Sequence, residues 1–188
     1  TTAIMGETGA GKTTLIRLIL ALLKPQQGKV EIYGSKGTDN PQTYEVSPLT
    51  RCNLVHVPQG NTLFSGTIRE NLLLGNPQAT EEEMREALHT ACADFVLQRP
   101  GGLDALCGEM GEGMSEGQAQ RIAIARALLQ PGRIYLFDEA CSALDDATER
   151  SILDNLEQAL ADKTIIWITH DDSVKARMQE TLELTSSS

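Results

Sequence analysis

The sequence has 188 residues, of which 40% are hydrophobic and 22% charged, and its 16 Lys and Arg against 26 Asp and Glu give a formal net charge of −10. This is the composition of one globular domain, large enough to bury a core without a disulfide or a structural metal. The acidic excess argues against nucleic acid as a partner, because binding to nucleic acid depends on clustered Lys and Arg side chains.

The cysteines and the apolar runs exclude further classes of protein. Cys52, Cys92, Cys107 and Cys141 lie far apart without a CxxC pair, so neither a zinc cage nor a disulfide framework is expected, and a reducing compartment is predicted. The apolar runs fall short of the roughly 20 residues that a membrane-spanning helix needs. The sequence starts at Thr1 without a leader segment, which we expect to mark a fragment boundary.

Strands and helices alternate at both ends of the chain. Strands are predicted at residues 3–5, 29–33, 53–57, 133–137 and 164–169, and helices at 15–24 and 147–161. Residues 34–48 are rich in Gly, Ser, Thr, Asn and Pro and predict a loop or a weak hairpin.

The middle of the chain has a helical pattern. Thr80 with Glu83 and Ser115 with Gln118 have the spacing of capping boxes. Near-continuous apolar strands on either side are typical of a buried parallel sheet. We therefore predict one α/β domain over residues 1–188, with a mainly parallel sheet flanked by helices in a core of residues 1–60 and 131–188, and an inserted helical subdomain at 61–130.

A glycine-rich motif lies between the first predicted strand and helix. Residues 6–13 read GETGAGKT and match the pattern GxxxxGK(S/T) in full. Glycines let backbone N–H groups turn toward phosphates, and the helix N-terminus adds partial positive charge. Lys12 is expected to bridge the terminal phosphates and Thr13 to ligate Mg²⁺. The predicted phosphate-binding residues are Gly6, Glu7, Thr8, Gly9, Ala10, Gly11, Lys12, Thr13 and Thr14. The alternative is a glycine-rich turn without a ligand.

A later apolar strand ends in two carboxylates, Asp138 and Glu139. The carboxyl end of a parallel strand is where ligands bind in α/β sheets, so this pair is predicted to lie beside the phosphate loop. Asp138 can hold a hydrated Mg²⁺ ion, and Glu139 is placed to polarise an attacking water. A solvated acidic turn is the alternative, and the glycine motif makes it the weaker one.

A third motif decides between families of phosphate-loop proteins. Met114-Ser115-Glu116-Gly117-Gln118 is followed by AQRIAIARALLQPGRIYLFDEACSALD. With the glycine loop, this order resembles the ATP-binding-cassette (ABC) ATPases and their signature segment, second nucleotide motif and aspartate loop. The resemblance covers essentially the whole chain. It implies a P-loop NTPase core that hydrolyses ATP to ADP and phosphate with Mg²⁺ as cofactor.

Three further residues match motifs of this family. Gln59 matches the glutamine loop, which implies a contact to Mg²⁺ or water and a hinge to the helical insertion. His170 matches the switch histidine, which implies that it contacts the γ-phosphate and, with Glu139, positions the water. Asp145 matches the aspartate loop, which implies a link between two nucleotide sites. The predicted catalytic residues are Glu139, His170 and Gln59, and the predicted Mg²⁺ ligands are Thr13, Gln59 and Asp138. Taken alone, Gln59 could be a solvated loop residue and His170 a core residue.

The residues of the signature segment are themselves suited to bind a phosphate. Ser115 at a helix N-cap, with Gly117 nearby, presents a hydroxyl and N–H donors at which a phosphate could dock. The resemblance implies that Ser115, Glu116, Gly117 and Gln118 face ATP bound by a second nucleotide-binding domain, so that two domains enclose two ATP molecules. Glu116 replaces the first glycine of the family's common LSGGQ. An ordinary capped helix is the alternative.

Two stretches resemble exporter-type members. They are LFSGTIRENL at residues 63–72 and Gly108-Glu109-Met110-Gly111. The resemblance implies the ATPase of a transporter, coupling dimer closure to export through separate transmembrane domains at the cytoplasmic face of a membrane. A soluble repair or translation ATPase and a module that binds ATP without turnover are the alternatives. The family's N-terminal β-subdomain, with its adenine-stacking aromatic residue, is expected to be absent because only five residues precede Gly6.

Overall fold

A parallel sheet of five strands forms the centre of the computed structural model, which describes residues 1–7, 9–34, 42–107 and 113–185. The strand order is β4-β7-β8-β1-β9, and each neighbouring pair is parallel. The strands are β1 (Thr2–Gly6), β4 (Leu54–Val57), β7 (Ile134–Asp138), β8 (Thr164–Ile168) and β9 (Glu180–Leu184). The predicted parallel sheet is therefore confirmed.

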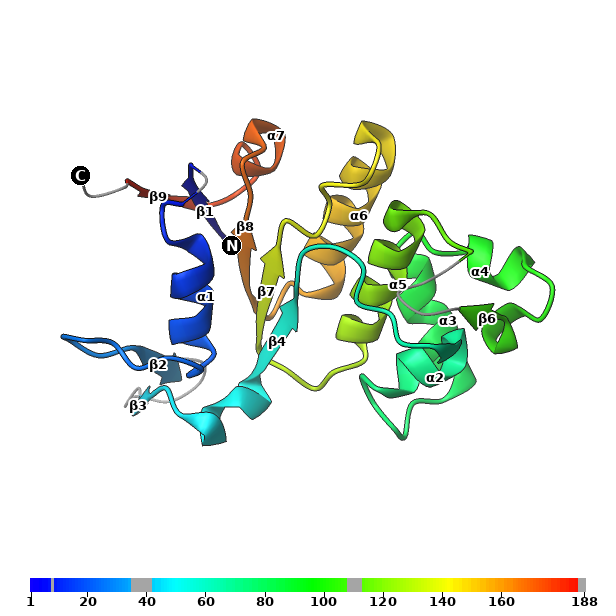
Figure 1. Cartoon of the computed structure of the whole chain (residues 1–188), viewed down its shortest axis with the longest axis horizontal. Helices are drawn as coiled ribbons and strands as arrows, with labels where there is room; N and C mark the ends of the chain where they lie inside the picture. Colours follow the sequence, from blue (N-terminus) through cyan, green and yellow to red (C-terminus); the bar gives the residue numbers. More distant parts are fainter. Residues whose placement is uncertain (8, 35–41, 108–112, 186–188) are drawn as a thin grey trace.

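Helices cover this sheet and extend beyond one of its edges. They are α1 (Lys12–Ile19), α2 (Ile68–Leu73), α3 (Glu81–Thr90), α4 (Phe95–Gln98), α5 (Glu116–Leu128), α6 (Asp146–Ala159) and α7 (Asp172–Lys175), with 3-10 turns η1 (Pro48–Asn53) and η2 (Gly102–Asp104). Figure 1 shows α2 to α5 gathered at one end of the molecule and α1 at the other. The division into a core and an inserted subdomain at 61–130 stays a prediction. In the described residues, no helix has the length and apolar character needed to cross a membrane.

Two small antiparallel pairs complete the fold. One joins β2 (Glu31–Gly34) to β3 (Gln42–Glu45), and the other joins β5 (Gly66–Thr67) to β6 (Leu106–Cys107). The first pair corresponds to the weak hairpin predicted after residue 33. Residues 35–41 between its strands lie outside the described part of the chain.

The core is built from the apolar strands and the helix faces packed on them. Tyr135 and Trp167, which lie in two of the strands whose apolar runs predict burial, are 2% and 3% exposed. The rings of Phe137 and Trp167 stack with centroids 4.3 Å apart across β7 and β8. A second cluster of Ile4, Ile16 and Ile168 fixes α1 on the sheet. This packing holds the start of α1 beside the carboxyl end of β1.

Both predicted capping boxes are present. Thr80 and Glu83 form one at the start of α3, and Ser115 and Gln118 form the other at the start of α5. A third box that the sequence analysis did not identify begins α2, with Thr67 as N-cap. The caps define where these helices begin because each satisfies backbone N–H groups that have no partner inside the helix.

The prediction for the first helix was wrong at both ends. The helix begins at Lys12 and ends at Ile19, well before Pro25. Ala21 adopts a left-handed conformation with φ +52°, and the N–H groups of Leu22 and Leu23 bond to the carbonyl of Arg17. The guanidinium of Arg51 donates to the carbonyls of Leu20 and Ala21. A distant side chain thus satisfies the carbonyl groups at this helix end.

Candidate active site

The glycine motif forms a loop between β1 and α1. Gly9 and Gly11 have φ angles of +89° and +94°, a left-handed conformation that costs other residues roughly 1–2 kcal/mol. Gly11 is the N-cap of α1 and makes no side-chain capping bond. The N–H groups of the first helical turn therefore remain suited to bind an anion. Thr8, predicted as part of this loop, lies outside the described residues.

Lys12 lies across this loop. Its ammonium group donates to the carbonyl oxygen of Gly6 and to that of Glu7, the second at 3.4 Å. Gly6 cannot carry a side chain here, because an added Cβ would lie 2.9 Å from the carbonyl oxygen of Leu184 on β9. Thr13 and Thr14 are exposed in the first turn of α1. The loop thus combines a positive charge, hydroxyl groups and backbone donors in one short segment.

The three predicted catalytic side chains meet at the carboxyl edge of the sheet. Gln59, which follows β4, donates from Nε2 to Oε2 of Glu139 at 2.7 Å. His170, which follows β8, has its Nδ1 3.5 Å from Oε1 of the same carboxylate, an ion pair when the imidazole is protonated. Glu139 itself follows β7. Three neighbouring strands therefore deliver one carboxylate, one amide and one imidazole to the same place.

Asp138 interacts electrostatically both with Glu139 of this cluster and with Lys12 of the phosphate loop. Its pKa is raised chiefly because burial disfavours the charged carboxylate, and also because Glu139 is negative; the Lys12 ammonium acts in the opposite direction. Two neighbouring carboxyl groups and one ammonium therefore interact within a single site. Such an arrangement favours the binding of a further cation.

The donors at this edge fit Mg²⁺. Thr13, Gln59 and Asp138 offer hydroxyl, amide and carboxylate oxygens, which are the ligands that Mg²⁺ prefers. No group of three or more His, Cys, Asp or Glu side chains in the described ranges is arranged to hold a metal. Mg²⁺ does not need such a group, because it is held by one or two carboxylates together with substrate phosphates and water.

The direction of the Glu139 side chain is set by an unusual backbone. Glu139 has φ +47°, in the left-handed region that a residue with a side chain adopts at a cost. Its N–H donates to the carbonyl of Ile168 at 2.9 Å. Its own carbonyl accepts from the N–H of Ser142 at 3.1 Å and from Nε2 of Gln120 at 3.3 Å. These bonds hold the residue in a conformation that its own preference would not select.

The signature segment begins α5. Ser115 is exposed, and its Oγ accepts from the N–H of Gln118 at 3.2 Å, while Oε1 of Gln118 accepts from the N–H of Ser115 at 3.2 Å. A Cβ added to Gly117 would lie 2.7 Å from the carbonyl oxygen of Ala143, so only glycine permits this approach. Figure 1 shows α5 and α1 on opposite sides of β7. Within one chain, the signature segment is therefore not brought to the phosphate loop.

Asp145 has a local role that the sequence analysis did not assign. It is the N-cap of α6, and its carboxylate accepts from the N–H of Thr148 at 3.0 Å and from the Thr148 hydroxyl at 2.7 Å. The hydroxyl bond is the main reason why the pKa of Asp145 is lowered. The sequence contained this signal, because Asp before a helical run is a common N-cap.

Comparison with known proteins identifies the family. A family model described as ABC transporter matches residues 1–142. The chain belongs to the ABC transporter family. The resemblance inferred from the signature segment and nucleotide motifs is thereby confirmed.

The ABC relatives are much longer than this chain. The heterocyst differentiation ATP-binding protein HepA of Nostoc sp. is 40% identical over 178 residues, which is 94% of this chain and 28% of HepA. The mitochondrial iron-sulfur clusters transporter ABCB7 of Oryzias latipes is 38% identical over 184 residues, 97% of this chain and 24% of that protein. The chain thus spans about a quarter of the length of these two relatives.

A solved ABC structure has the same fold. The structure of a bacterial Atm1-family ABC exporter with ATP bound superposes with a TM-score of 0.86 at 35% sequence identity. The match covers 98% of this chain and 32% of the exporter chain. The predicted P-loop NTPase fold is confirmed by this agreement and by the parallel sheet.

One of the exporter-like stretches of this ABC chain is organised by a buried amide. Asn71 is 1% exposed; its Nδ2 donates to the carbonyls of Phe64 and Thr67, and its Oδ1 accepts from the N–H of Phe64. This holds the segment after Gln59 in a compact turn with Phe64 exposed. The other stretch, Gly108 to Gly111, lies outside the described residues.

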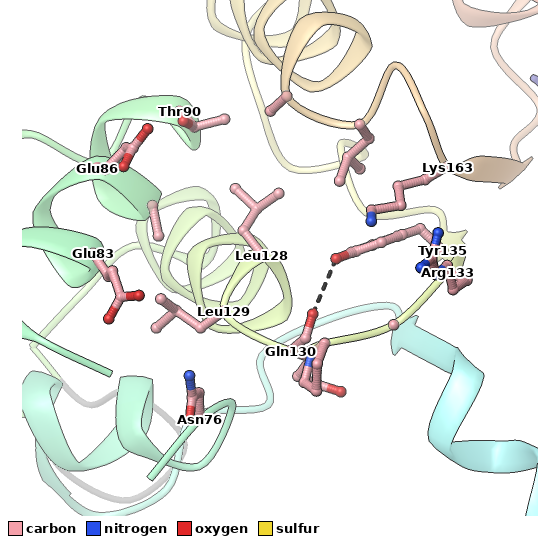
Figure 2. Close-up of a pocket in the computed structure, with 15 residues that line it drawn as sticks. Asn76, Glu83, Glu86, Thr90, Leu128, Leu129, Gln130, Arg133, Tyr135 and Lys163 are labelled. Carbon is pink, nitrogen blue, oxygen red and sulfur yellow. Dashed lines mark hydrogen bonds between the residues drawn. The ribbon is translucent and has the colours of Figure 1, made fainter. Parts of the chain in front are cut away.

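Two cavities differ in their relation to the candidate active site. One of about 130 Å³ is lined by Glu139 and His170 and by further residues such as Cys141 and Glu149. Figure 2 shows the other, of about 470 Å³, lined by Glu83, Leu128 and Lys163, where the Tyr135 hydroxyl donates to the carbonyl of Gln130. That cavity lies at the amino end of β7, whereas the carboxylates lie at its carboxyl end, so it is not part of the candidate site.

Proposed function

We propose that the chain is the ATP-binding and ATP-hydrolysing domain of an ABC transporter. The observation that carries this proposal is the convergence of Gln59 and His170 on the carboxylate of Glu139, at the sheet edge that also holds Asp138. A carboxylate held by an amide and an imidazole is suited to orient and polarise a water molecule. The reaction is the hydrolysis of ATP to ADP and phosphate.

The chain's residues supply positioning and charge. Backbone N–H groups of Gly6 to Thr14 surround the phosphates, and the ammonium of Lys12 leaves its loop carbonyls to neutralise the terminal phosphoryl group. Glu139 orients the water, Gln59 holds the carboxylate, and His170 contacts the γ-phosphate. Thr13, Gln59 and Asp138 would hold Mg²⁺, which when bound supplies charge neutralisation of the phosphates.

A complete site needs a second nucleotide-binding domain. The phosphate loop and the capped start of α5 lie on opposite sides of β7, and both Thr13 and Ser115 are exposed. Two copies arranged head to tail would let Ser115, Glu116, Gly117 and Gln118 of one meet ATP held by the other. Asp145, at the start of α6, would link the two sites across that interface.

The transport role rests on the relatives. A protein of Rickettsia felis with 39% identity is named a putative export ATP-binding/permease protein, and the matching structure is an ABC exporter. We infer that ATP-driven dimer closure is coupled to export through transmembrane domains, with this domain at the cytoplasmic face of the membrane. None of the relatives described above is named for DNA repair or translation, so that alternative has no support among them.

The test compares two substitutions in the purified protein. Glu139→Gln is expected to lower kcat for ATP about 100-fold or more while leaving ATP binding intact, because it removes only the water-orienting charge. Lys12→Ala is expected to weaken ATP binding itself. ATP hydrolysis by phosphate release and ATP binding by titration calorimetry, both with Mg²⁺, measure these effects.

Glu86→Gln, an exposed and conservative change on α3, is the matched control and should behave as the wild type. Wild-type turnover by the Glu139→Gln variant would show that the proposed catalytic centre is wrong. An unaltered binding curve for Lys12→Ala would remove this residue from the phosphate site.

A further inference from the structure

Gln120 is a fully buried amide that the mechanism above does not use. Its side chain is 0% exposed on α5. Nε2 donates to the carbonyl oxygen of Glu139 at 3.3 Å, and Oε1 accepts from the N–H of Ala143 at 3.3 Å. Both ends of the amide therefore contact the segment that follows β7. Loss of both bonds would leave the N–H of Ala143 without the Gln120 oxygen that accepts from it, and the carbonyl of Glu139 with only the N–H of Ser142.

The position of Gln120 on its helix makes this amide unusual. Residues 123, 124 and 127, which are three, four and seven positions later and so share its helix face, are Ala, Ile and Ala, and all are buried. An apolar residue would be the ordinary choice at position 120. A glutamine here is explained by the two hydrogen bonds that it makes.

The carbonyl that Gln120 holds belongs to the residue with the strained backbone. Glu139 has φ +47°, and its carboxylate is the one that Gln59 and His170 contact. Because the side chain leaves from a left-handed backbone, a change of that backbone would redirect the carboxylate. Gln120 is one of the groups that keep the carbonyl in place.

The same helix also carries the signature segment. Ser115 precedes Gln120 by five residues, which corresponds to about 7.5 Å along a helix axis. Gly117 lies so close to Ala143 that an added Cβ would be 2.7 Å from the Ala143 carbonyl oxygen. The first turns of α5 and residues 139–143 therefore pack as one unit, with Gln120 as their hydrogen-bonded connection.

We propose that Gln120 is a positioning residue that transmits the position of the capped start of α5 to the backbone of Glu139. The proposal rests on the proposed function, in which Ser115 meets the ATP held by a second domain while Glu139 acts on the ATP held by its own. A shift of α5 on docking of Ser115 to a phosphate then moves the Gln120 amide, and with it the Glu139 carbonyl. Each chain thereby links its two half-sites internally.

The experiment replaces this amide by groups of similar length. Gln120→Met keeps the volume and removes both hydrogen bonds; it is expected to lower kcat for ATP about tenfold or more and to leave the Kd for ATP within about twofold. Hydrogen exchange should become faster at the amides of residues 139–144. Ile124→Val, a buried change one turn later on α5, is the control for loss of packing and should cause neither effect.

Gln120→Glu provides a second, reversible test. A protonated glutamic acid has one donor and one acceptor oxygen, as the amide does, whereas the carboxylate has no donor for the Glu139 carbonyl. The ratio of the Gln120→Glu rate to the wild-type rate is therefore expected to rise as the pH falls. A ratio that stays constant with pH would contradict the assigned hydrogen bond.

The outcomes separate this proposal from the proposed function. If the wild-type protein hydrolyses ATP and the Gln120→Met variant has the same kcat, the positioning role is overturned and the proposed function is not. Equal losses of rate and melting temperature in Gln120→Met and Ile124→Val also overturn it, because packing then suffices as the explanation. If the wild type does not hydrolyse ATP, the proposed function fails, and unchanged hydrogen exchange at residues 139–144 in Gln120→Met separately overturns the proposal that Gln120 positions this segment.

Discussion

His56 shows how burial without a hydrogen-bond partner changes the pKa of a single side chain. It lies on β4 opposite Leu136 of β7, and its Nε2 has no hydrogen-bond partner in the described structure. Burial lowers its pKa from 6.5, because the charged imidazolium is less well solvated inside the protein. The folded protein therefore keeps this imidazole neutral at a pH at which the unfolded chain begins to protonate it.

This difference predicts a pH dependence of stability. Below the unfolded pKa of 6.5 the unfolded state binds more protons at this position than the folded state, so stability is lost progressively as the pH falls from 6.5 toward the lower pKa of His56 in the folded protein. His56→Val should flatten the fall in the free energy of unfolding on acidification. Urea unfolding of both proteins at about pH 7.5 and about pH 5.5 measures it. The same change in the free energy of unfolding between the two pH values in both proteins would contradict the prediction.

At the scale of elements, one residue is both a helix cap and a predicted functional residue. Asp145 caps α6 through Thr148, and it is also the residue expected to link two nucleotide sites. These two roles require different chemistry, because a cap needs an oxygen acceptor whereas a contact across a dimer interface can depend on the charge and length of the carboxylate. A pair of substitutions can therefore separate them.

Asp145→Ala is expected to lower the melting temperature by a few degrees because it removes the cap, whereas Asp145→Ser should retain most of the stability. If Asp145 also links the sites, both variants lose ATPase activity despite this difference in stability. Differential scanning calorimetry and phosphate release measure the two properties. A fully active Asp145→Ser variant would leave Asp145 with the capping role alone.

At the scale of the whole molecule, the two halves of the proposed site are held apart. The sheet lies between α1 and α5, so no movement of a single loop brings Ser115 to the phosphate loop of the same chain. Assembly with a second domain is the arrangement that uses both surfaces. ATP should therefore promote dimerisation, and slow hydrolysis should preserve the dimer.

We expect the Glu139→Gln variant to form an ATP-dependent dimer in sedimentation velocity experiments. Adding Ser115→Arg should abolish that dimer while leaving ATP binding by the monomer nearly unchanged, because the arginine would obstruct the contact with the second nucleotide. Ser151→Arg, at an exposed position on α6, is the matched control and should still dimerise. Loss of ATP binding in the Ser115→Arg monomer would argue against a role in trans.

Features with a local physical cause could be predicted from the sequence. The phosphate loop needs glycines and a following helix, the cap at Ser115 needs a glutamine three residues later, and the buried strands are continuous apolar runs. The proximity of Gln59, Glu139 and His170 could also be predicted from the sequence. Each follows a parallel strand, and parallel strands end at the same edge of a sheet.

Other features exist only because distant segments meet. Gln120 contacts residues 19 and 23 positions away, Arg51 reaches the end of α1 from 30 positions away, and β9 joins β1 from the opposite end of the chain. Periodicity and capping patterns report interactions over a few residues, so they contain no record of these partners. The sequence by itself determined the phosphate loop, the capped helices and the buried strands of this ABC domain. The tertiary structure alone decided where α1 ends, which strand pairs beside β1 and which side chain holds Glu139, because those contacts form only when the chain folds back on itself.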